Sequence, residues 1–232
     1  MRVQLQKTAC ALALLAATST SAFAIDVRVI GSITPAACTP TLSGGGTVDY
    51  GVIRPAELTD DAYTTLAEKN LAFAIDCDAP AKVALRVING RPGTAAGSIG
   101  TGTESDGEAP VRLLGLVNIG VVGLGLDGED KIGGYAIRIT PGSVTADSNS
   151  VDSLRKNSSG TTWTNDGFAG VLYDPYISRQ TSWAATGTVL PVAFENMSGE
   201  LAVQAYINHA SELDLSKPIN FEGLTTIELE YL

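Results

Sequence analysis

The amino-acid sequence predicts an all-β fold, more specifically one β-sandwich-like domain that carries insertions. Glycine is abundant, with 25 of the 232 residues. β-Branched residues recur in short runs separated by turn-forming residues, which is typical of strands joined by tight turns. No segment shows an apolar pattern of helical period over more than a couple of turns. No internal repeat or linker divides the chain, so a single domain is expected.

The first half of the chain is expected to hold strands at 47–53 (TVDYGVI), 69–77 (KNLAFAIDC) and 81–89 (AKVALRVIN). Each is a short segment rich in apolar residues. Residues 78–80 (DAP) are expected to form a tight connection between the second and third strands. Residues 113–126 (LLGLVNIGVVGLGL) are apolar but interrupted by glycines and too short to span a bilayer, which favours buried strands.

The second half is expected to hold strands at 132–142, 187–196 and 200–208, with a turn at 196–199 (NMSG) between the last two. The polar stretch 143–167 predicts loops or hairpin excursions.

The chain ends in TTIELEYL (225–232), which predicts a terminal strand. Ile227, Leu229 and Tyr231 alternate with Glu228 and Glu230, the pattern of a half-buried strand. Because chain termini fray unless they are tied into a sheet, this strand is expected to pair with another one.

Residues 1–24 are predicted to be a secretory signal peptide. Arg2 and Lys7 precede an apolar stretch over 9–17, and AFA at 22–24 fits the A-x-A cleavage pattern. A membrane anchor is disfavoured because the apolar stretch is about half of the roughly 20 residues that a span needs. Cleavage would leave 25–232 as the exported chain.

The charge of the chain is acidic. Removal of residues 1–24 takes away two basic residues and no acidic one, so the formal net charge falls from −10 to −12. This balance argues against binding to nucleic acid or to an anionic membrane, since both need a basic surface.

Cys38 and Cys77 are the two cysteines that remain after cleavage. An even pair in an exported protein predicts a disulfide, which closes a loop of about 40 residues and contributes roughly 4 kcal/mol in the chain-entropy model. Free thiols or a two-ligand metal site are the competing interpretations, and a single histidine with no CxxC motif makes both poor.

The N-terminal part of the exported chain, IDVRVIGSITPAAC (25–38), also has the pattern of a strand. Its apolar face includes Val27, Val29 and Ile33, with Gly31 set between them. Glycine in a strand often marks a close approach of another backbone, and an unpaired apolar edge strand is an aggregation hazard unless it is used for pairing.

These residues carry a resemblance to a known family. VRVIGSITPAAC (27–38) resembles the N-terminal extension of chaperone–usher pilins, and TTIELEYL (225–232), with its penultimate aromatic Tyr231, is similar to their C-terminal strand. The spacing of Cys38 and Cys77 resembles the pilin disulfide. VVGLGLDGEDKIGGYAIRI (121–139) resembles larger exported fimbrial-subunit-like proteins of unknown function.

The resemblance implies a fold, a mechanism and partners. The fold would be an incomplete immunoglobulin-like sandwich over 36–232 with insertions, preceded by a donor-strand extension over 25–35. Ile227, Leu229 and Tyr231 would line the acceptor groove, which a periplasmic chaperone fills first. At the outer-membrane usher, Val27, Val29, Gly31 and Ile33 of the next subunit would replace the chaperone strand. The protein would then pass through the periplasm into a cell-surface fimbria made of the same or related subunits.

Two alternatives remain open. The N-terminal segment could pair within its own domain and complete an ordinary sandwich, and such a secreted domain could be a carbohydrate-binding module or adhesin. A cluster of aromatic residues lies in one region and could either stack on a sugar receptor or pack as a satellite core, the interpretation that we favour. The cluster comprises Trp163, Phe168, Tyr173, Tyr176 and Trp183.

The sequence does not predict an enzyme. A Ser-His-Asp or Cys-His arrangement would need the lone His209, which lies at the end of an expected strand. There is no HExxH motif and no P-loop. Asp127, Glu129 and Asp130 lack the EF-hand spacing, which favours a solvated hairpin over a calcium site. No metal or cofactor is expected.

Overall fold

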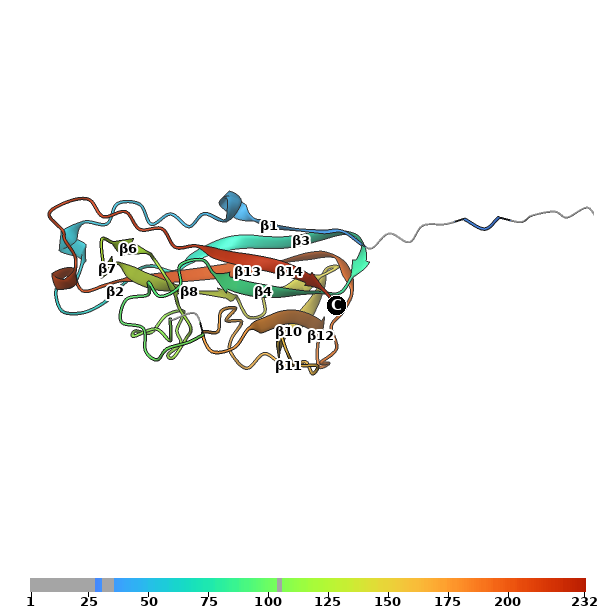
Figure 1. Cartoon of the computed structure of the whole chain (residues 1–232). Helices are drawn as coiled ribbons and strands as arrows, with labels where there is room; N and C mark the ends of the chain where they lie inside the picture. Colours follow the sequence, from blue (N-terminus) through green and yellow to red (C-terminus); the bar gives the residue numbers. More distant parts are fainter. Residues whose placement is uncertain (1–27, 31–35, 104–105) are drawn as a thin grey trace, which may run out of the picture. The chain divides into compact units, whose positions relative to one another are not determined.

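A computed structural model describes residues 28–30, 36–103 and 106–232 (Figure 1). The chain divides at Thr34, and Pro35–Leu232 forms the body of the fold. The described part of this body contains β-strands and three short 3-10 turns but no α-helix, which confirms the all-β prediction. No helix among the described residues is long and apolar enough to cross a membrane.

The longest strands are β3, β10 and β13. The full set comprises β1 (Cys38–Leu42), β2 (Thr64–Thr65), β3 (Lys69–Ala81), β4 (Val83–Asn89), β5 (Val122–Gly123), β6 (Leu126–Asp127), β7 (Asp130–Lys131), β8 (Gly133–Ile139), β9 (Thr145–Ala146), β10 (Asn149–Asn157), β11 (Thr164–Asn165), β12 (Arg179–Ala185), β13 (Phe194–Ile207) and β14 (Thr225–Tyr231). The 3-10 turns are η1 (Ser43–Gly46), η2 (Pro55–Glu57) and η3 (Ala210–Glu212).

The strands form an almost closed antiparallel path with two free ends. The order along this path is β1-β3-β13-β9-β10-β12-β4-β14. Strands β2 and β8 pair with β13, β5 pairs with β8, and β11 pairs with β10, whereas β6 and β7 form a separate hairpin. β1 and β14 stand at the two ends of this path and are therefore edge strands. The path folds back on itself (Figure 1).

The core lies between the layers that this folding brings together. On β3, Leu71, Phe73 and Ile75 alternate with exposed residues and point inward. Trp183 of β12 is buried opposite them, with its ring 6.4 Å from that of Phe73. A second apolar cluster surrounds the buried Tyr206 of β13 beneath the insertion that follows β4.

The predicted disulfide is confirmed. Cys38 and Cys77 are directly opposite each other on β1 and β3, with an S–S distance of 2.06 Å. The bridge therefore fastens the edge strand β1 to the core strand β3.

Several predicted strands are confirmed, with shifted ends. Segment 69–77 lies in β3, 81–89 becomes β4, 132–142 contains β8, and the terminal strand is β14. The tight connection at 78–80 is wrong, because β3 continues to Ala81 and β4 belongs to a different part of the path.

Other predicted elements differ more. The turn at 196–199 is wrong, since these residues lie inside the continuous β13, where a Cβ on Gly199 would be 3.0 Å from Val144. Only Phe194 onward in 187–196 is strand, and 113–126 is mostly irregular buried chain apart from β5 and the start of β6. Segment 143–167, predicted as loop, contains the nine-residue strand β10. Segment 47–53 has no strand pairing.

Candidate functional site: an apolar groove between two sheet edges

The terminal strand β14 pairs on one side only. Its partner is β4, and no described strand pairs with its other edge. The N–H of Gly90 donates to the carbonyl of Leu224 (2.8 Å), and the N–H of Leu232 donates to that of Lys82 (3.0 Å). Because hydrogen-bonded pairs alternate along an antiparallel ladder, the even-numbered residues of β14 bond to β4. The backbone groups of Ile227 and Leu229 therefore point to the unpaired edge.

Strand β1 is the opposite edge, and its residues likewise alternate between bonding to the neighbouring strand and facing away from it, except that here the odd-numbered residues bond. The N–H of Asp78 donates to the carbonyl of Ala37 (3.0 Å), so the backbone groups of Cys38 and Pro40 face away from β3. Pro40 has no N–H to leave unpaired, which suits an edge. The N–H of Cys38 donates to the Tyr231 hydroxyl at 2.7 Å. This bond joins the two edges at one end.

Away from that joint, the two edges separate around a groove, called here the acceptor groove. It consists of two adjacent hollows of about 420 Å³ and about 310 Å³, both of which are lined by Phe221. One wall is the segment 42–58 that follows β1, and the other is the segment 213–227 that leads into β14. Figure 1 shows these two segments, blue and red, running alongside each other.

The floor of the acceptor groove is the core itself. It includes Leu71 of β3, Ile137 of β8, and Leu201 and Val203 of β13. The walls are apolar but only half-buried, and they comprise Leu42, Val48, Ile53, Leu58, Leu213, Leu215, Ile219, Phe221 and Ile227. Water therefore contacts apolar surface along the groove, and the core is open to solvent there.

The first wall leaves the sheet at a glycine turn. Gly44, Gly45 and Gly46 all have positive φ, a backbone conformation that side chains disfavour, and they end β1. The wall is fixed to the floor by Tyr50, whose hydroxyl accepts a hydrogen bond from the N–H of Ala205 at 3.2 Å. Burial raises the pKa of Tyr50 above its ordinary value.

The second wall continues the alternation of β14 toward the N-terminus. Leu213, Leu215, Ile219, Phe221 and Ile227 are half-buried. Most residues between them are exposed, which is the pattern of an extended chain with one apolar face.

Gly223 and Tyr135 meet where this wall enters β14. A Cβ at Gly223 would lie 2.3 Å from the Tyr135 ring, so only glycine fits there without a shift. The Tyr135 hydroxyl bonds to the Thr225 hydroxyl at 2.5 Å. Burial, more than any other cause, raises the pKa of Tyr135 to about 12.

The structure places the three predicted acceptor residues on the inward face of β14. Ile227 lines the acceptor groove, Leu229 is half-buried against the core, and Tyr231 closes the end through its bond to Cys38. On the outward face, Arg86 of β4 forms ion pairs with Glu228 (2.5 Å) and Glu230 (2.8 Å).

Of the predicted donor residues, only Val29 is described, and it is exposed. Val27, Gly31 and Ile33 lie outside the described residues.

Sequence reasoning missed most of the groove. The wall 213–223 could have been found, because the spacing of Leu213, Leu215, Ile219 and Phe221 extends the period of the terminal strand. The wall 42–58 carries no such signal, since its apolar residues are unevenly spaced and residues 47–53 form no strand.

Residues that could carry other chemistry are engaged elsewhere. The ring of His209 packs against Tyr63 at 4.3 Å, and Asp127 forms an ion pair with Lys217 at 3.1 Å. Among the described residues, no group of three potential metal ligands comes together.

Comparisons with known proteins identify relatives but no solved fold. A family model described as "Protein of unknown function (DUF1120)" matches residues 27–135. The Escherichia coli K12 protein GltF is 30% identical over 97% of this chain and 94% of its own length. The uncharacterized protein YhcF of the same organism is 28% identical over 90% of each chain. No solved structure matches significantly.

Proposed function

The chain belongs to the same family as GltF, and we propose that it is a structural subunit of a cell-surface fimbria that polymerises by strand addition. The observation that carries this proposal is the unpaired edge of β14 beside the acceptor groove. An added strand would receive main-chain hydrogen bonds from the edge and insert alternate side chains into the groove.

The donor is residues 25–35 of another copy or of a related subunit. Eleven extended residues span about 36 Å, which exceeds the roughly 23 Å of a seven-residue strand such as β14. Val27, Val29 and Ile33 would fill the groove, and Gly31 would pass where it is narrow. The face that donates and the face that accepts differ, so the contact is heterologous and generates an open fibre.

Export and assembly complete the proposal. Residues 1–24 direct export, and a periplasmic chaperone covers the acceptor groove until the outer-membrane usher replaces it with the next subunit. In the incomplete immunoglobulin-like sandwich that the resemblance implies, the missing strand would lie in the gap between β1 and β14. No catalytic step is part of this function.

The test is periplasmic expression with and without a co-expressed chaperone. Alone, the chain is expected to oligomerise or to be degraded, and the chaperone is expected to rescue it and to co-purify with it. Leu229→Ser should weaken co-purification because it places a hydroxyl on the apolar face of β14. Thr226→Ser is the matched control, since Thr226 is exposed on the other face of the same strand.

A stable monomer that keeps its fold after deletion of residues 25–34, and that binds no chaperone, would contradict the proposal. That outcome would favour the alternative, a self-contained secreted sandwich that binds carbohydrate.

A further inference from the structure

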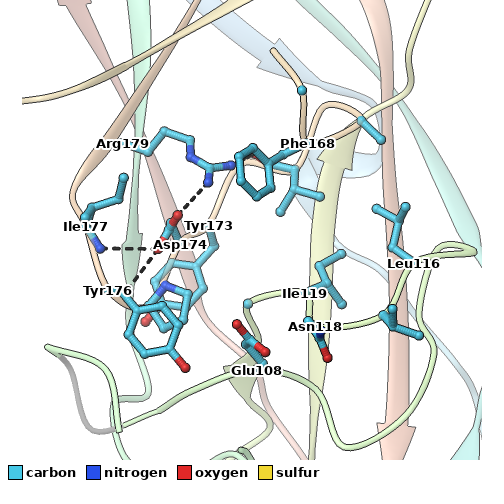
Figure 2. A pocket seen from close by; sticks show the side chains of 16 residues that line it. Glu108, Leu116, Asn118, Ile119, Phe168, Tyr173, Asp174, Tyr176, Ile177 and Arg179 are labelled. Atoms are coloured by element: carbon cyan, nitrogen blue, oxygen red, sulfur yellow. Dashed lines mark hydrogen bonds and ion pairs between the residues drawn. The ribbon is translucent and has the colours of Figure 1, made fainter. Parts of the chain in front are cut away.

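A second cavity lies between the insertion that follows β4 and the segment that joins β11 to β12, and it shares no lining residue with the acceptor groove. It has a volume of about 500 Å³, within the range of roughly 300–1,000 Å³ typical of small-molecule sites. Its walls are the segments 116–120 and 167–179, which are far apart in the sequence. Figure 2 shows the side chains that line it.

The predicted aromatic cluster divides at this cavity. Trp183 is buried in the core, and Trp163 packs under the Lys156 ammonium at 4.9 Å. Phe168, Tyr173 and Tyr176 line the cavity. The cluster is therefore neither one satellite core nor one stacking surface.

Tyr176 is the ring available for stacking. It is 44% exposed, and its hydroxyl donates to the carbonyl of Ile99 at 3.4 Å, which fixes the orientation of the ring. Phe168 is less available because two guanidinium groups, of Arg155 at 4.2 Å and Arg179 at 4.6 Å, already lie over its ring.

Two polar side chains face the same space without partners of their own. Glu108 and Asn118 both line the cavity, and neither side chain hydrogen-bonds to any described residue. In Figure 2 the Glu108 carboxylate lies between Tyr176 and Asn118. A carboxylate accepts hydrogen bonds, and an amide both donates and accepts, so together they match a ligand rich in hydroxyl groups.

The walls of the cavity are held rigidly. Asp174 accepts the N–H of Tyr176 at 2.9 Å and forms an ion pair of 2.5 Å with the buried guanidinium of Arg179. Asn118 and Ala169, one on each wall, have φ values of 54° and 52°, a conformation that non-glycine residues seldom adopt. Such backbone strain is concentrated at functional sites, where it pre-organises the binding surface.

We propose that this cavity binds a neutral saccharide. The apolar C–H face of the sugar ring packs on the Tyr176 ring, whose face carries partial negative charge. Sugar hydroxyls donate to the Glu108 carboxylate and bond to the Asn118 amide. The sugar is neutral because Arg179, the cation in the lining, is paired with Asp174, which leaves Glu108 to repel an anion.

The test measures the binding of neutral mono- and disaccharides to the exported chain (25–232). Binding is detected by calorimetry and by changes in the NMR signals of the added sugar. The chain is used as it is isolated from the periplasm, as monomer or oligomer. Tyr176→Ala and Glu108→Gln are each expected to weaken binding by about tenfold or more. Tyr176→Phe keeps the ring and should retain most of the affinity.

Trp163→Ala is the matched control, because Trp163 is an aromatic residue of the same region that does not line the cavity. It should bind as the unchanged protein does. The proposal is overturned if no neutral saccharide binds at about 10 mM, a very weak limit. It is also overturned if only acidic sugars bind, or if Tyr176→Ala alters assembly of the chain but not sugar binding. The absence of sugar binding would leave the acceptor groove untouched, since the two sites share no lining residue.

Discussion

Gly223→Ala should destabilise the protein at the entrance to β14. The new Cβ would lie 2.3 Å from Cε1 of Tyr135, whereas carbon atoms in contact prefer about 3.5–4.0 Å. The ring cannot easily move aside, because it is buried and its hydroxyl bonds to Thr225. Overpacking of this kind costs about 1–3 kcal/mol. In a domain of about 200 residues, each kcal/mol lowers Tm by about 2–4 °C.

Gly167→Ala is the control for this substitution. A Cβ at Gly167 would meet nothing within 4 Å, and its φ is not positive. Each Gly→Ala change lowers the conformational entropy of the unfolded chain by the same amount. The stabilisation that results is common to both variants and cancels when their free energies of unfolding are compared. Urea unfolding of both variants gives the difference directly.

The double variant Gly223→Ala/Tyr135→Leu tests whether the Tyr135 ring causes the destabilisation. If the clash is with the ring, the double variant should be less destabilised than the sum of the two single variants. Equal stability of Gly223→Ala and Gly167→Ala would refute the reasoning.

Three further predictions concern the disulfide, the pKa of Tyr135 and the ion pairs of Arg86. Replacing Cys38 and Cys77 with serine should lower the free energy of unfolding by about 4 kcal/mol, from the separation of 39 residues, and an unchanged urea midpoint would contradict this. The pKa of Tyr135 in the folded state, about 12, lies above its ordinary value of 10.0, so the stability it contributes is complete below pH 10 and is lost between pH 10 and 12. Tyr135→Phe should lack this loss of about 2–3 kcal/mol, measured as the difference between the two alkaline unfolding curves. Arg86→Met should cost about 1 kcal/mol, since it removes the cation that pairs with Glu228 and Glu230 on a partly exposed surface; an effect independent of salt would argue against an electrostatic cause.

The all-β class and the terminal strand could be predicted because their signals are local. Ile227, Leu229 and Tyr231 alternate strictly with two glutamates, and a single register satisfies both faces. The disulfide followed from the even number of cysteines in a chain predicted to be exported, and the cross-strand pairing of Cys38 with Cys77 agrees.

The strand β10 could not be predicted from its own residues. Its buried residues, Val151 and Leu154, are three positions apart rather than two, and polar residues surround them. Pairing with β12 on one side over seven residue pairs determines its conformation. In the same way, Asn196–Gly199 has the composition of a turn, but pairing with β3 keeps it extended.

The acceptor groove was predicted on one side only. Residues 47–58 of its first wall form no strand, so no periodicity marks Val48, Ile53 or Leu58. The cavity around Tyr176 joins segments about 50 residues apart, and only the fold brings Glu108 and Asn118 to the aromatic residues.

Hydrogen exchange at the amides of Ile227 and Leu229 tests the strand-addition proposal most directly. In a chain lacking residues 25–34, these two N–H groups should exchange quickly, whereas those of Thr226 and Glu228, which bond to β4, should be protected. Addition of a peptide with the sequence of 25–35 should slow exchange at Ile227 and Leu229 but leave that of Thr226 and Glu228 unchanged. Protection of both amides before the peptide is added, or no change after its addition, would contradict the proposal that β14 accepts a strand from another molecule.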